Sequence, residues 1–253
     1  MIDTHCHLYL DQFEDDLDAV LDRAAKAGVS HIFLPAIDLD SLPKMDQLQH
    51  SEIAFHKMAG IHPTSVNDGK DIIEEKLHDL CSRPEYVAVG ETGLDYYWSE
   101  DYKSEQQESL QMHCRVAKEV QKPIVLHNRE STGDLLDIIE EEQDGNLNGI
   151  WHSFTGSVEE GKRAVDLGLE LGIGGIFTFK NAGVDNAVAQ LPIEHMMIET
   201  DAPFLAPDPK RGKRNEPAFV KYTAERLAEV MDMSLDELES VTDENALRFF
   251  GIS

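Results

Sequence analysis

Short apolar runs recur along the chain, and several of them end in a side chain that can bind a metal ion. Residues 87–90 lead into Glu91, and residues 123–126 lead into His127. Runs of this length without alternating polar positions are typical of parallel strands that are buried on both faces. A polar residue at the carboxyl end of several different strands is the arrangement of an active site in a barrel enzyme. The ligand-type residues in or at the ends of such runs are His5, His7, Glu91, His127, His152 and Asp201.

Strand-like and helix-like segments alternate almost throughout the chain. We expect one strand near residue 3 and others at 31–36, 53–61, 87–91, 123–127, 149–152, 169–175 and 196–201. We expect helices at 15–27, 41–49, 69–80, 103–121, 132–142, 157–168, 181–190, 217–231 and 234–250. Eight strands with short links in about 200 residues favour a closed parallel barrel over a doubly wound sheet. The predicted fold is therefore α/β, a regular or distorted (β/α)8 TIM barrel in one domain over residues 1–253, with its active site at the C-terminal ends of the strands.

The composition fits a single large enzyme domain outside the membrane. The chain has 253 residues and 41% hydrophobic residues, enough for a sizeable core. No stretch approaches the roughly 18 consecutive apolar residues of a membrane span, and the N-terminus lacks the pattern of a signal peptide. The three scattered cysteines, Cys6, Cys81 and Cys114, fit reduced thiols in a cytoplasm.

The formal net charge of −27 limits the kinds of partner that the chain can bind. Nonspecific binding to long duplex DNA depends on basic side chains that displace counterions, so this charge argues against wrapping a duplex. It does not argue against a site where bound divalent cations supply the positive charge. Acidic faces such as residues 140–142 and 236–237 are expected to be solvated surface.

The N-terminal histidine pair predicts a metal site when it is taken together with the other strand ends. His5 and His7 are two residues apart in an extended segment, so their side chains point to the same face. Two network or surface histidines are the alternative for this pair alone, but ligand-type residues at four further strand ends favour a metal site. Six ligands are too many for one catalytic ion that keeps an open position, so two ions with Glu91 bridging them fit better. The expected cofactors are two divalent ions, drawn from Mg, Mn or Zn.

Seven motifs occur in order along the chain and resemble one family. They are DTHCHL at 3–8, GIHP at 60–63, GETGLDY at 90–96, HNR at 127–129, SFTG at 153–156, ETDAP at 199–203 and RNEP at 214–217. Together they resemble the TatD family of metal-dependent deoxyribonucleases, and the resemblance covers residues 2–250. The wider relation is to the amidohydrolase superfamily of distorted barrels, in which the bridging ligand is often a carboxylated lysine where this chain has Glu91.

The resemblance implies a division of the ligands between two ions. It implies that one ion is held by His5, His7, Glu91 and Asp201, and that the second is held by Glu91, His127 and His152. We expect Glu91 and Asp201 to carry catalysis. Asp201 is the expected general base, because a carboxylate beside a cation can orient water and accept its proton, although a role as ligand only is the alternative. Glu199 is expected to support this site or to fill a barrel layer.

Three further residues are predicted to bind substrate: Arg129, Asn215 and His62. Arg129 lies two residues after His127, where its guanidinium can hold a phosphate, and a structural salt bridge is the alternative. His62 ends the third strand, where substrate contact and a structural role are equally open. Asn215 resembles the Asn-Glu-Pro element of the family at the substrate rim, although a helix start at Pro217 would by itself explain that motif.

Two loops at the predicted mouth carry side chains that suit nucleic acid. Residues 210–214 form a dense basic cluster in this acidic chain, which can recruit a nucleic-acid end or be a solvated loop. Tyr96, Tyr97 and Trp98 follow the fourth strand and can stack on bases or plug the loop.

The predicted function is divalent-metal-dependent hydrolysis by a TatD-type deoxyribonuclease that cleaves phosphodiester bonds of DNA with activated water. Single-stranded DNA or DNA ends are the expected partner, with no membrane and no obligate protein partner. The alternative is a binuclear-metal hydrolase of esters or amides, such as a deacylase of misacylated tRNA or of a small molecule. A non-enzymatic metal-binding or scaffolding subunit is the third hypothesis, and six intact ligand positions argue against it.

Overall fold

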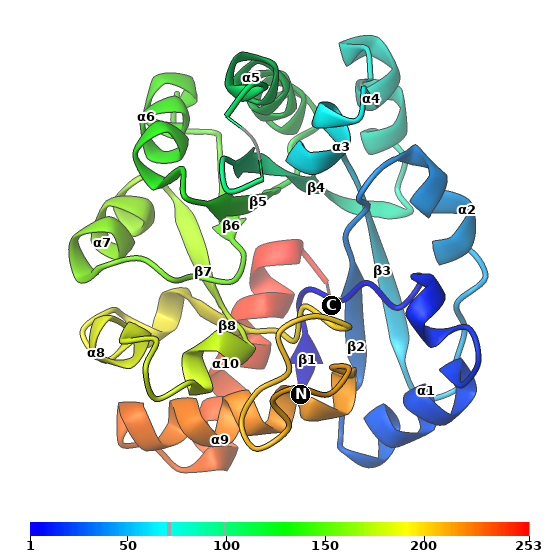
Figure 1. Cartoon of the computed structure of the whole chain (residues 1–253), viewed down its shortest axis with the longest axis vertical. Coiled ribbons are helices and arrows are strands. Elements are labelled where there is room, and N and C mark those ends of the chain that lie inside the picture. The colour runs from blue at the N-terminus through cyan, green and yellow to red at the C-terminus, as the bar shows by residue number, and fades with distance from the viewer. Residues whose placement is uncertain (70–71, 99, 253) are drawn as a thin grey trace.

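Eight parallel strands form one sheet, and each strand pairs with the next along the chain (Figure 1). The computed structural model describes residues 1–69, 72–98 and 100–252. All pairings between these strands are parallel, which confirms the predicted α/β barrel. The strands are β1 (Ile2–Asp3), β2 (His31–Leu34), β3 (Ala54–Ala59), β4 (Tyr86–Asp95), β5 (Ile124–Arg129), β6 (Gly149–Trp151), β7 (Leu169–Ile173) and β8 (Met196–Ile198).

All the helices except the last surround the sheet on its outer side, as the chain order of a barrel requires (Figure 1). The helices are α1 (Leu17–Lys26), α2 (Leu42–Met45), α3 (Pro63–Asn67), α4 (Glu74–Cys81), α5 (Lys103–Val120), α6 (Thr132–Glu142), α7 (Val158–Asp166), α8 (Val184–Val188), α9 (Val220–Met231) and α10 (Leu235–Phe250). None of the helices within the described ranges is long and apolar enough to cross a bilayer.

The last helix closes the amino end of the barrel. Figure 1 shows α10 in red across the middle of the ring. Ala246 and Phe250 of this helix pack against apolar side chains that lie at the bottom of the strands. Those side chains are at most 2% exposed. They are Ile2, Phe33, Met58, Ala88, Val125, Ile150 and Met197.

The barrel closes between its first and last strands through loop backbone rather than through a strand ladder. The Asp201 N–H donates to the carbonyl of His5 at 2.8 Å, and the His7 N–H donates to the carbonyl of Ala202 at 2.8 Å. Cys6 and Ala202 form an isolated parallel bridge at the same place. This closure makes the barrel a distorted one and sets the N-terminal histidines beside the end of β8.

A buried carboxyl group reinforces the same junction. Asp3 is fully buried and accepts hydrogen bonds from the Thr200 amide at 2.9 Å and the Thr200 hydroxyl at 2.6 Å. Burial is the main cause that raises the pKa of Asp3 to about 7, and the hydrogen bonds from Thr200 oppose it. Asp3 therefore joins residues that are 197 positions apart in the chain.

Several predicted boundaries differ from those in the structure. The helix expected at 69–80 corresponds to α4, the separate helix α3 before it was not predicted, and residues 70 and 71 of that prediction lie outside the described residues. Pro63 begins α3 because its fixed φ suits a first helical turn. The seventh strand ends at Ile173, and a 3-10 turn at Gly175–Thr178 follows it where a strand was expected to continue.

A buried histidine of α5 holds the end of β3 in place. His113 accepts a hydrogen bond from the Ile61 amide at 3.1 Å through Nε2, and its Nδ1 donates to the Ser109 carbonyl at 2.7 Å. Burial lowers the pKa of His113 to about 4. Because both ring nitrogens are used in the neutral form, the imidazole is held uncharged inside the protein.

We predict that His113 makes the protein less stable as the pH falls from about 6.5 to about 4. In this window the unfolded chain takes up a proton that the folded chain refuses, so the free energy of unfolding decreases by up to about 3 kcal/mol from this group. The variant His113→Gln has no imidazole at this position, so its free energy of unfolding should not fall for this reason. The difference in free energy of unfolding between parent and variant should therefore be smaller at pH 5 than at pH 7. Urea unfolding of both proteins measures the effect, with a substitution of the partly exposed His78, His78→Gln, as control. A loss of stability in His113→Gln that is the same at pH 7 and pH 5 would contradict the prediction.

Candidate metal centre

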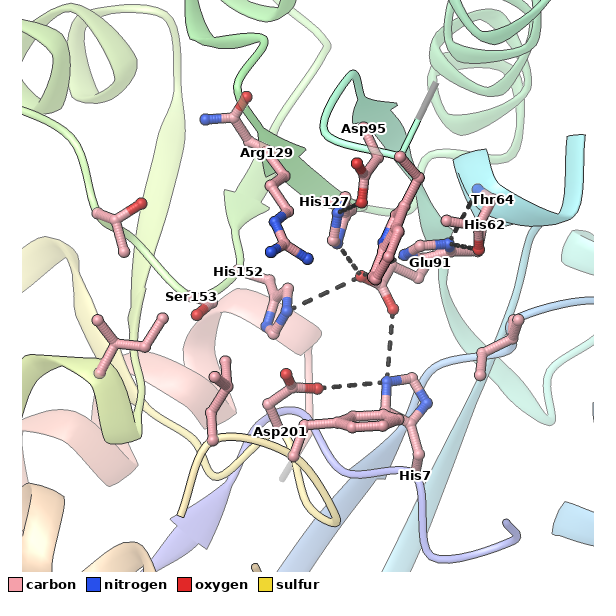
Figure 2. Close-up of a pocket in the computed structure, with 17 residues that line it drawn as sticks. His7, His62, Thr64, Glu91, Asp95, His127, Arg129, His152, Ser153 and Asp201 are labelled. Atoms are coloured by element: carbon pink, nitrogen blue, oxygen red, sulfur yellow. Dashed lines mark hydrogen bonds and ion pairs between the residues drawn. The ribbon is translucent and has the colours of Figure 1, made fainter. Parts of the chain in front are cut away.

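The carboxyl ends of the strands surround a cavity of about 550 Å³ at the end of the barrel opposite to α10. Figure 2 shows the labelled side chains converging on this space from several different strands and loops. The histidines and carboxylates that line it are His7, His62, Glu91, Asp95, His127, His152 and Asp201, and His5 lies buried behind them.

Glu91 lies between two sets of imidazole nitrogens and presents one carboxylate oxygen to each. Its Oε2 is 3.2 Å from Nε2 of His5 and 3.5 Å from Nε2 of His7. Its Oε1 is 3.2 Å from Nδ1 of His127 and 3.8 Å from Nε2 of His152. Glu91 is 2% exposed, so this carboxylate depends on its neighbours rather than on water.

Asp201 completes the first of these sets from the opposite side. Its Oδ1 is 3.5 Å from Nε2 of His7 and 3.9 Å from Nε2 of His5. The backbone of Asp201 has a φ of 57°, a left-handed conformation that aspartate tolerates better than most residues. The hydrogen bond from its amide to the His5 carbonyl fixes this conformation, so the barrel closure itself aims the carboxylate.

The spacing of these atoms fits divalent cations. Nitrogen and oxygen ligands about 2.05 Å from a tetrahedral ion lie roughly 3.3 Å from each other. The Nε2 atoms of His5 and His7 are 3.2 Å apart, and both are within 3.5 Å of Glu91 Oε2. Among the described residues, three groups of possible ligand atoms lie within 4.8 Å of one another. They are His5, His7 and Glu91; His5, His152 and Asp201; and His62, Glu91 and His127.

The hydrogen bonds of His7 leave its inner nitrogen free to bind a cation. The Tyr9 hydroxyl donates to the Pro35 carbonyl at 2.8 Å, so its oxygen accepts from Nδ1 of His7 at 2.8 Å. A neutral imidazole carries one proton, and this arrangement places it on Nδ1. The lone pair of Nε2 therefore points toward Glu91 and Asp201.

His127 and His152 are held in the same way by carboxylates. The Asp95 Oδ2 atom is 3.1 Å from Nε2 of His127, which leaves Nδ1 facing Glu91. The Glu199 Oε1 atom is 2.7 Å from Nδ1 of His152, an ion-pair contact that is not a well-aligned hydrogen bond. A carboxylate that contacts the outer nitrogen of a metal-binding histidine fixes the orientation of the ring and raises the basicity of its other nitrogen.

Glycine in β7 makes room for the buried Glu199. A β-carbon at Gly172 would lie 2.3 Å from Glu199 Oε2, so only glycine fits there. Glu199 Oε1 also accepts a hydrogen bond from the Ser153 amide at 2.6 Å. Glu199 thus supports His152 and the loop after β6, in agreement with the prediction that it supports the site.

His62 differs from the other histidines of the cavity. Its Nδ1 accepts a hydrogen bond from the Thr64 amide at 3.1 Å, which puts the proton of the neutral ring on Nε2. That Nε2 lies 3.6 Å from Glu91 Oε1. Burial, and then the neighbouring His127, lower the pKa of His62 to about 3. His62 is therefore arranged as a neutral hydrogen-bond donor, which suits the predicted contact with substrate better than a ligand role.

The charges of the centre are distributed as a cation site requires. Burial works against ionisation of Glu91, but His5 and His62 hold its pKa well below the ordinary value. The pKa of Asp201 is also lowered, because His152 and His7 outweigh the opposing effect of burial. Burial opposes protonation of His152, yet Glu199 and Asp201 raise its pKa to about 10. Each carboxylate is thus ionised and surrounded by groups that favour its charge.

Arg129 extends over the cavity without a carboxylate partner. Figure 2 shows its guanidinium pointing toward the space between His127 and His152. Its central carbon lies 3.6 Å from the ring centre of Tyr97. Within the described ranges the Arg129 guanidinium makes no hydrogen bond or ion pair, which argues against the alternative of a structural salt bridge. The guanidinium is available to an anion at the mouth.

Asn215 is predicted to be a substrate-binding residue that helps shape the substrate rim, and the structure corrects the part of that prediction that concerns contact with substrate. Its side chain is fully buried, and its amide nitrogen donates to the carbonyls of Thr200 and Phe204, each at 2.7 Å. Asn215 therefore holds the loop after β8 in shape and does not line the cavity.

The two loops expected to contact nucleic acid contain two kinds of residue. Some side chains bind other parts of the protein, and others lie in or beside the cavity. In the basic cluster, Arg214 forms paired hydrogen bonds with Asp16 at 2.7 and 2.8 Å, and no residue of 210–214 lines the cavity. Tyr96 is buried and its hydroxyl donates to Asp134 at 2.9 Å. Trp98 lines the cavity and Tyr97 remains half-exposed beside Arg129.

Asp95 and Tyr9 are functional residues that the sequence interpretation missed. Both could have been found from the period of an extended chain, in which residues two or four apart share a face. Tyr9 lies two residues after His7, and Asp95 lies four residues after Glu91 within β4. The predicted fourth strand ended at Glu91, which placed Asp95 outside the site.

We predict that Asp95→Asn weakens metal binding about 10-fold to 100-fold while the protein stays folded. An amide either accepts a weaker hydrogen bond from His127 or donates to it and moves the ring proton to the nitrogen that faces Glu91. Titration of metal-free protein with Zn²⁺ or Mn²⁺ against a competing chelator measures the affinity. Asp137→Asn, at an exposed pair with Arg163, is the control, and equal affinities in the two variants would contradict the role of Asp95.

Known proteins share both the sequence and the fold of this chain. A family model described as TatD related DNase matches residues 2–251. The uncharacterized metal-dependent hydrolase YabD of Bacillus subtilis is 39% identical over 257 aligned residues and is covered fully, as is this chain. The uncharacterized metal-dependent hydrolase YcfH of Escherichia coli is 37% identical, over 100% of this chain and 96% of its own. The crystal structure of YjjV, a TatD homologue from Escherichia coli, gives a TM-score of 0.91 at 29% identity, over 100% of this chain and 98% of that one. This chain therefore belongs to the TatD family of metal-dependent hydrolases.

Proposed function

We propose that this protein is a deoxyribonuclease that hydrolyses phosphodiester bonds of DNA with two divalent cations. The observation that carries the proposal is the position of Glu91, which presents one oxygen to each of two separate sets of imidazole nitrogens. A carboxylate placed in this way would hold two ions close together, and such a pair would stabilise the attacking and leaving oxygens of a phosphoryl displacement.

The donors divide between two ion sites around Glu91. His5, His7 and Asp201 lie on the Oε2 side, and His127 and His152 lie on the Oε1 side. Bound divalent cations, Mg, Mn or Zn, would supply Lewis acidity and make water a stronger acid. His152 also stacks on His5 at 3.5 Å between ring centres, so the two sets share one wall.

The protonation states and positions of Asp201, His62 and Arg129 indicate what each can do for a bound phosphodiester. Asp201 is ionised and lines the cavity, so it is placed to accept a proton from attacking water. The Nε2–H of His62 and the unpaired guanidinium of Arg129 are placed to donate to non-bridging phosphate oxygens. Both act on a phosphodiester from the open side of the cavity.

The family supports the choice of DNA, since the matching model is described as a DNase. The names of the two relatives state metal-dependent hydrolysis without a substrate, so esters and amides are the competing substrate classes. The three free, buried cysteines agree with a reducing cytoplasm as the place of action.

We predict that metal-free protein has no nuclease activity and that added Mg²⁺, Mn²⁺ or Zn²⁺ restores it. Asp201→Asn should lower kcat on DNA by about 10²-fold to 10⁴-fold, because it removes the proton acceptor. The assay follows an end-labelled single-stranded oligonucleotide, with the exposed Asp22→Asn as control. A parallel panel of aryl esters, anilides and an acylated tRNA tests the competing classes. Turnover of that panel without any cleavage of DNA by the metal-loaded protein would contradict the proposed substrate.

We predict that Glu91→Gln reduces the number of bound ions as well as the rate. An amide offers one oxygen where the carboxylate offers two, so it cannot bridge the two donor sets. Metal content after dialysis should fall from two ions per chain in the parent to one or none in the variant. A variant that retains both ions and the parental rate would contradict the bridging role.

A further inference from the structure

Large apolar side chains gather at the mouth of the cavity, where water would be expected to disfavour them. Among the described residues, the large hydrophobic side chains that are most exposed include Trp98 at 67%, Tyr97 at 49%, Phe204 at 43% and Leu205 at 40%. Trp98, Phe204 and Leu205 line the cavity, and Tyr97 stacks on Arg129. An apolar patch that rims a polar site marks a place where a ligand binds.

One wall of the mouth is built from the loop after β4. Tyr97 and Trp98 meet edge to face with ring centres 4.9 Å apart. The Arg129 guanidinium lies 3.6 Å from the Tyr97 ring centre and 5.5 Å from that of Trp98. The Tyr97 amide donates to Asp95 at 3.0 Å, and Asp95 also holds His127. The aromatic wall is therefore fixed to the same carboxylate that orients a predicted metal ligand.

The other wall is built from the loop after β8. The Phe204 carbonyl accepts from Asn215 at 2.7 Å, and the Phe204 amide donates to the Asp201 carbonyl at 2.8 Å. Leu205 has a φ of 51°, which is unfavourable for a branched side chain. A β-carbon at Gly175 would clash with the Leu205 carbonyl, so the turn after β7 and the loop after β8 are in close backbone contact. Buried hydrogen bonds and close packing thus hold Phe204 and Leu205 in exposed positions.

The position of these two walls indicates which chemical group can bind at the mouth. A flat apolar surface lies next to an unpaired guanidinium and a predicted cation site, which together accept a planar apolar group attached to phosphate. A nucleobase is such a group, and stacking on aromatic side chains is available to every base. Paired bases inside a duplex do not expose their faces, and the net charge of −27 disfavours long contacts with a duplex.

We propose that Trp98, together with Phe204 and Leu205, forms a stacking subsite for an unpaired nucleobase next to the phosphate that is cleaved. The proposal rests on the proposed nuclease function and makes that function selective for single-stranded DNA or frayed ends. Arg129, held against Tyr97, contacts the phosphate that joins the stacked nucleotide to the site.

The test compares a single-stranded oligonucleotide with a chain of the same length that carries abasic sites in place of bases. The parent should cleave the base-bearing chain with a kcat/KM roughly 10-fold to 100-fold higher. Trp98→Ala should bring this ratio close to one, mainly through a higher KM for the base-bearing chain, and Trp98→Phe should keep most of the preference. Tyr102→Ala is the matched control, since Tyr102 is 40% exposed but does not line this cavity.

The outcomes separate the subsite from the nuclease function. Equal cleavage of both chains by the parent, or a uniform loss on both in Trp98→Ala, overturns the subsite and leaves the nuclease function in place. If the parent cleaves neither chain, the nuclease function fails, and tryptophan fluorescence then decides the subsite. The other tryptophan, Trp151, is fully buried, so quenching by the base-bearing chain reports on Trp98. Quenching that the abasic chain does not produce supports the subsite, and its absence overturns it.

Discussion

The buried carboxylate of Glu91 is the constraint on which the organisation of the site depends. An ionised carboxylate removed from water is costly unless hydrogen bonds or positive charge compensate it. Here the compensation comes from imidazoles on both of its oxygens, and three of them, His7, His127 and His152, are contacted in turn by Tyr9, Asp95 and Glu199. For His7 and His127 the outer partner fixes which ring nitrogen carries the proton, so the lone pair of the other nitrogen points inward. A dense cluster of this kind is stable as a site for cations and would be difficult to explain as packing alone.

The barrel closure is the second constraint on the site, because it brings together residues from opposite ends of the chain. Asp3 and Thr200 join the first strand to the end of the last one. The hydrogen bond from Asp201 to the His5 carbonyl then aligns the carboxylate with the N-terminal histidines. The fold and the chemistry are thus linked at one junction, and the apolar layer under α10 leaves the opposite end of the barrel as the open one.

Sequence periodicity predicted most of the fold and the grouping of six residues, since buried parallel strands read as apolar runs and their ends must meet. It did not predict how the loops fold, because loop conformation is set by tertiary contacts. Asn215 shows this limit: its motif indicated substrate, whereas its side-chain nitrogen donates to two backbone carbonyls and its side-chain oxygen accepts from the Glu216 amide. Asp95 was missed because a strand was ended too early. The proton on His62 depends on one backbone hydrogen bond from Thr64, which no sequence pattern specifies.

If Glu91 holds two cations close to each other, those cations should interact magnetically. Electron paramagnetic resonance of the protein loaded with Mn²⁺ measures this interaction, because two ions that share a carboxylate are magnetically coupled. The spectrum of an exchange-coupled manganese pair is expected once two equivalents per chain have bound. A spectrum of isolated, uncoupled ions at every loading would show that Glu91 does not hold two cations together.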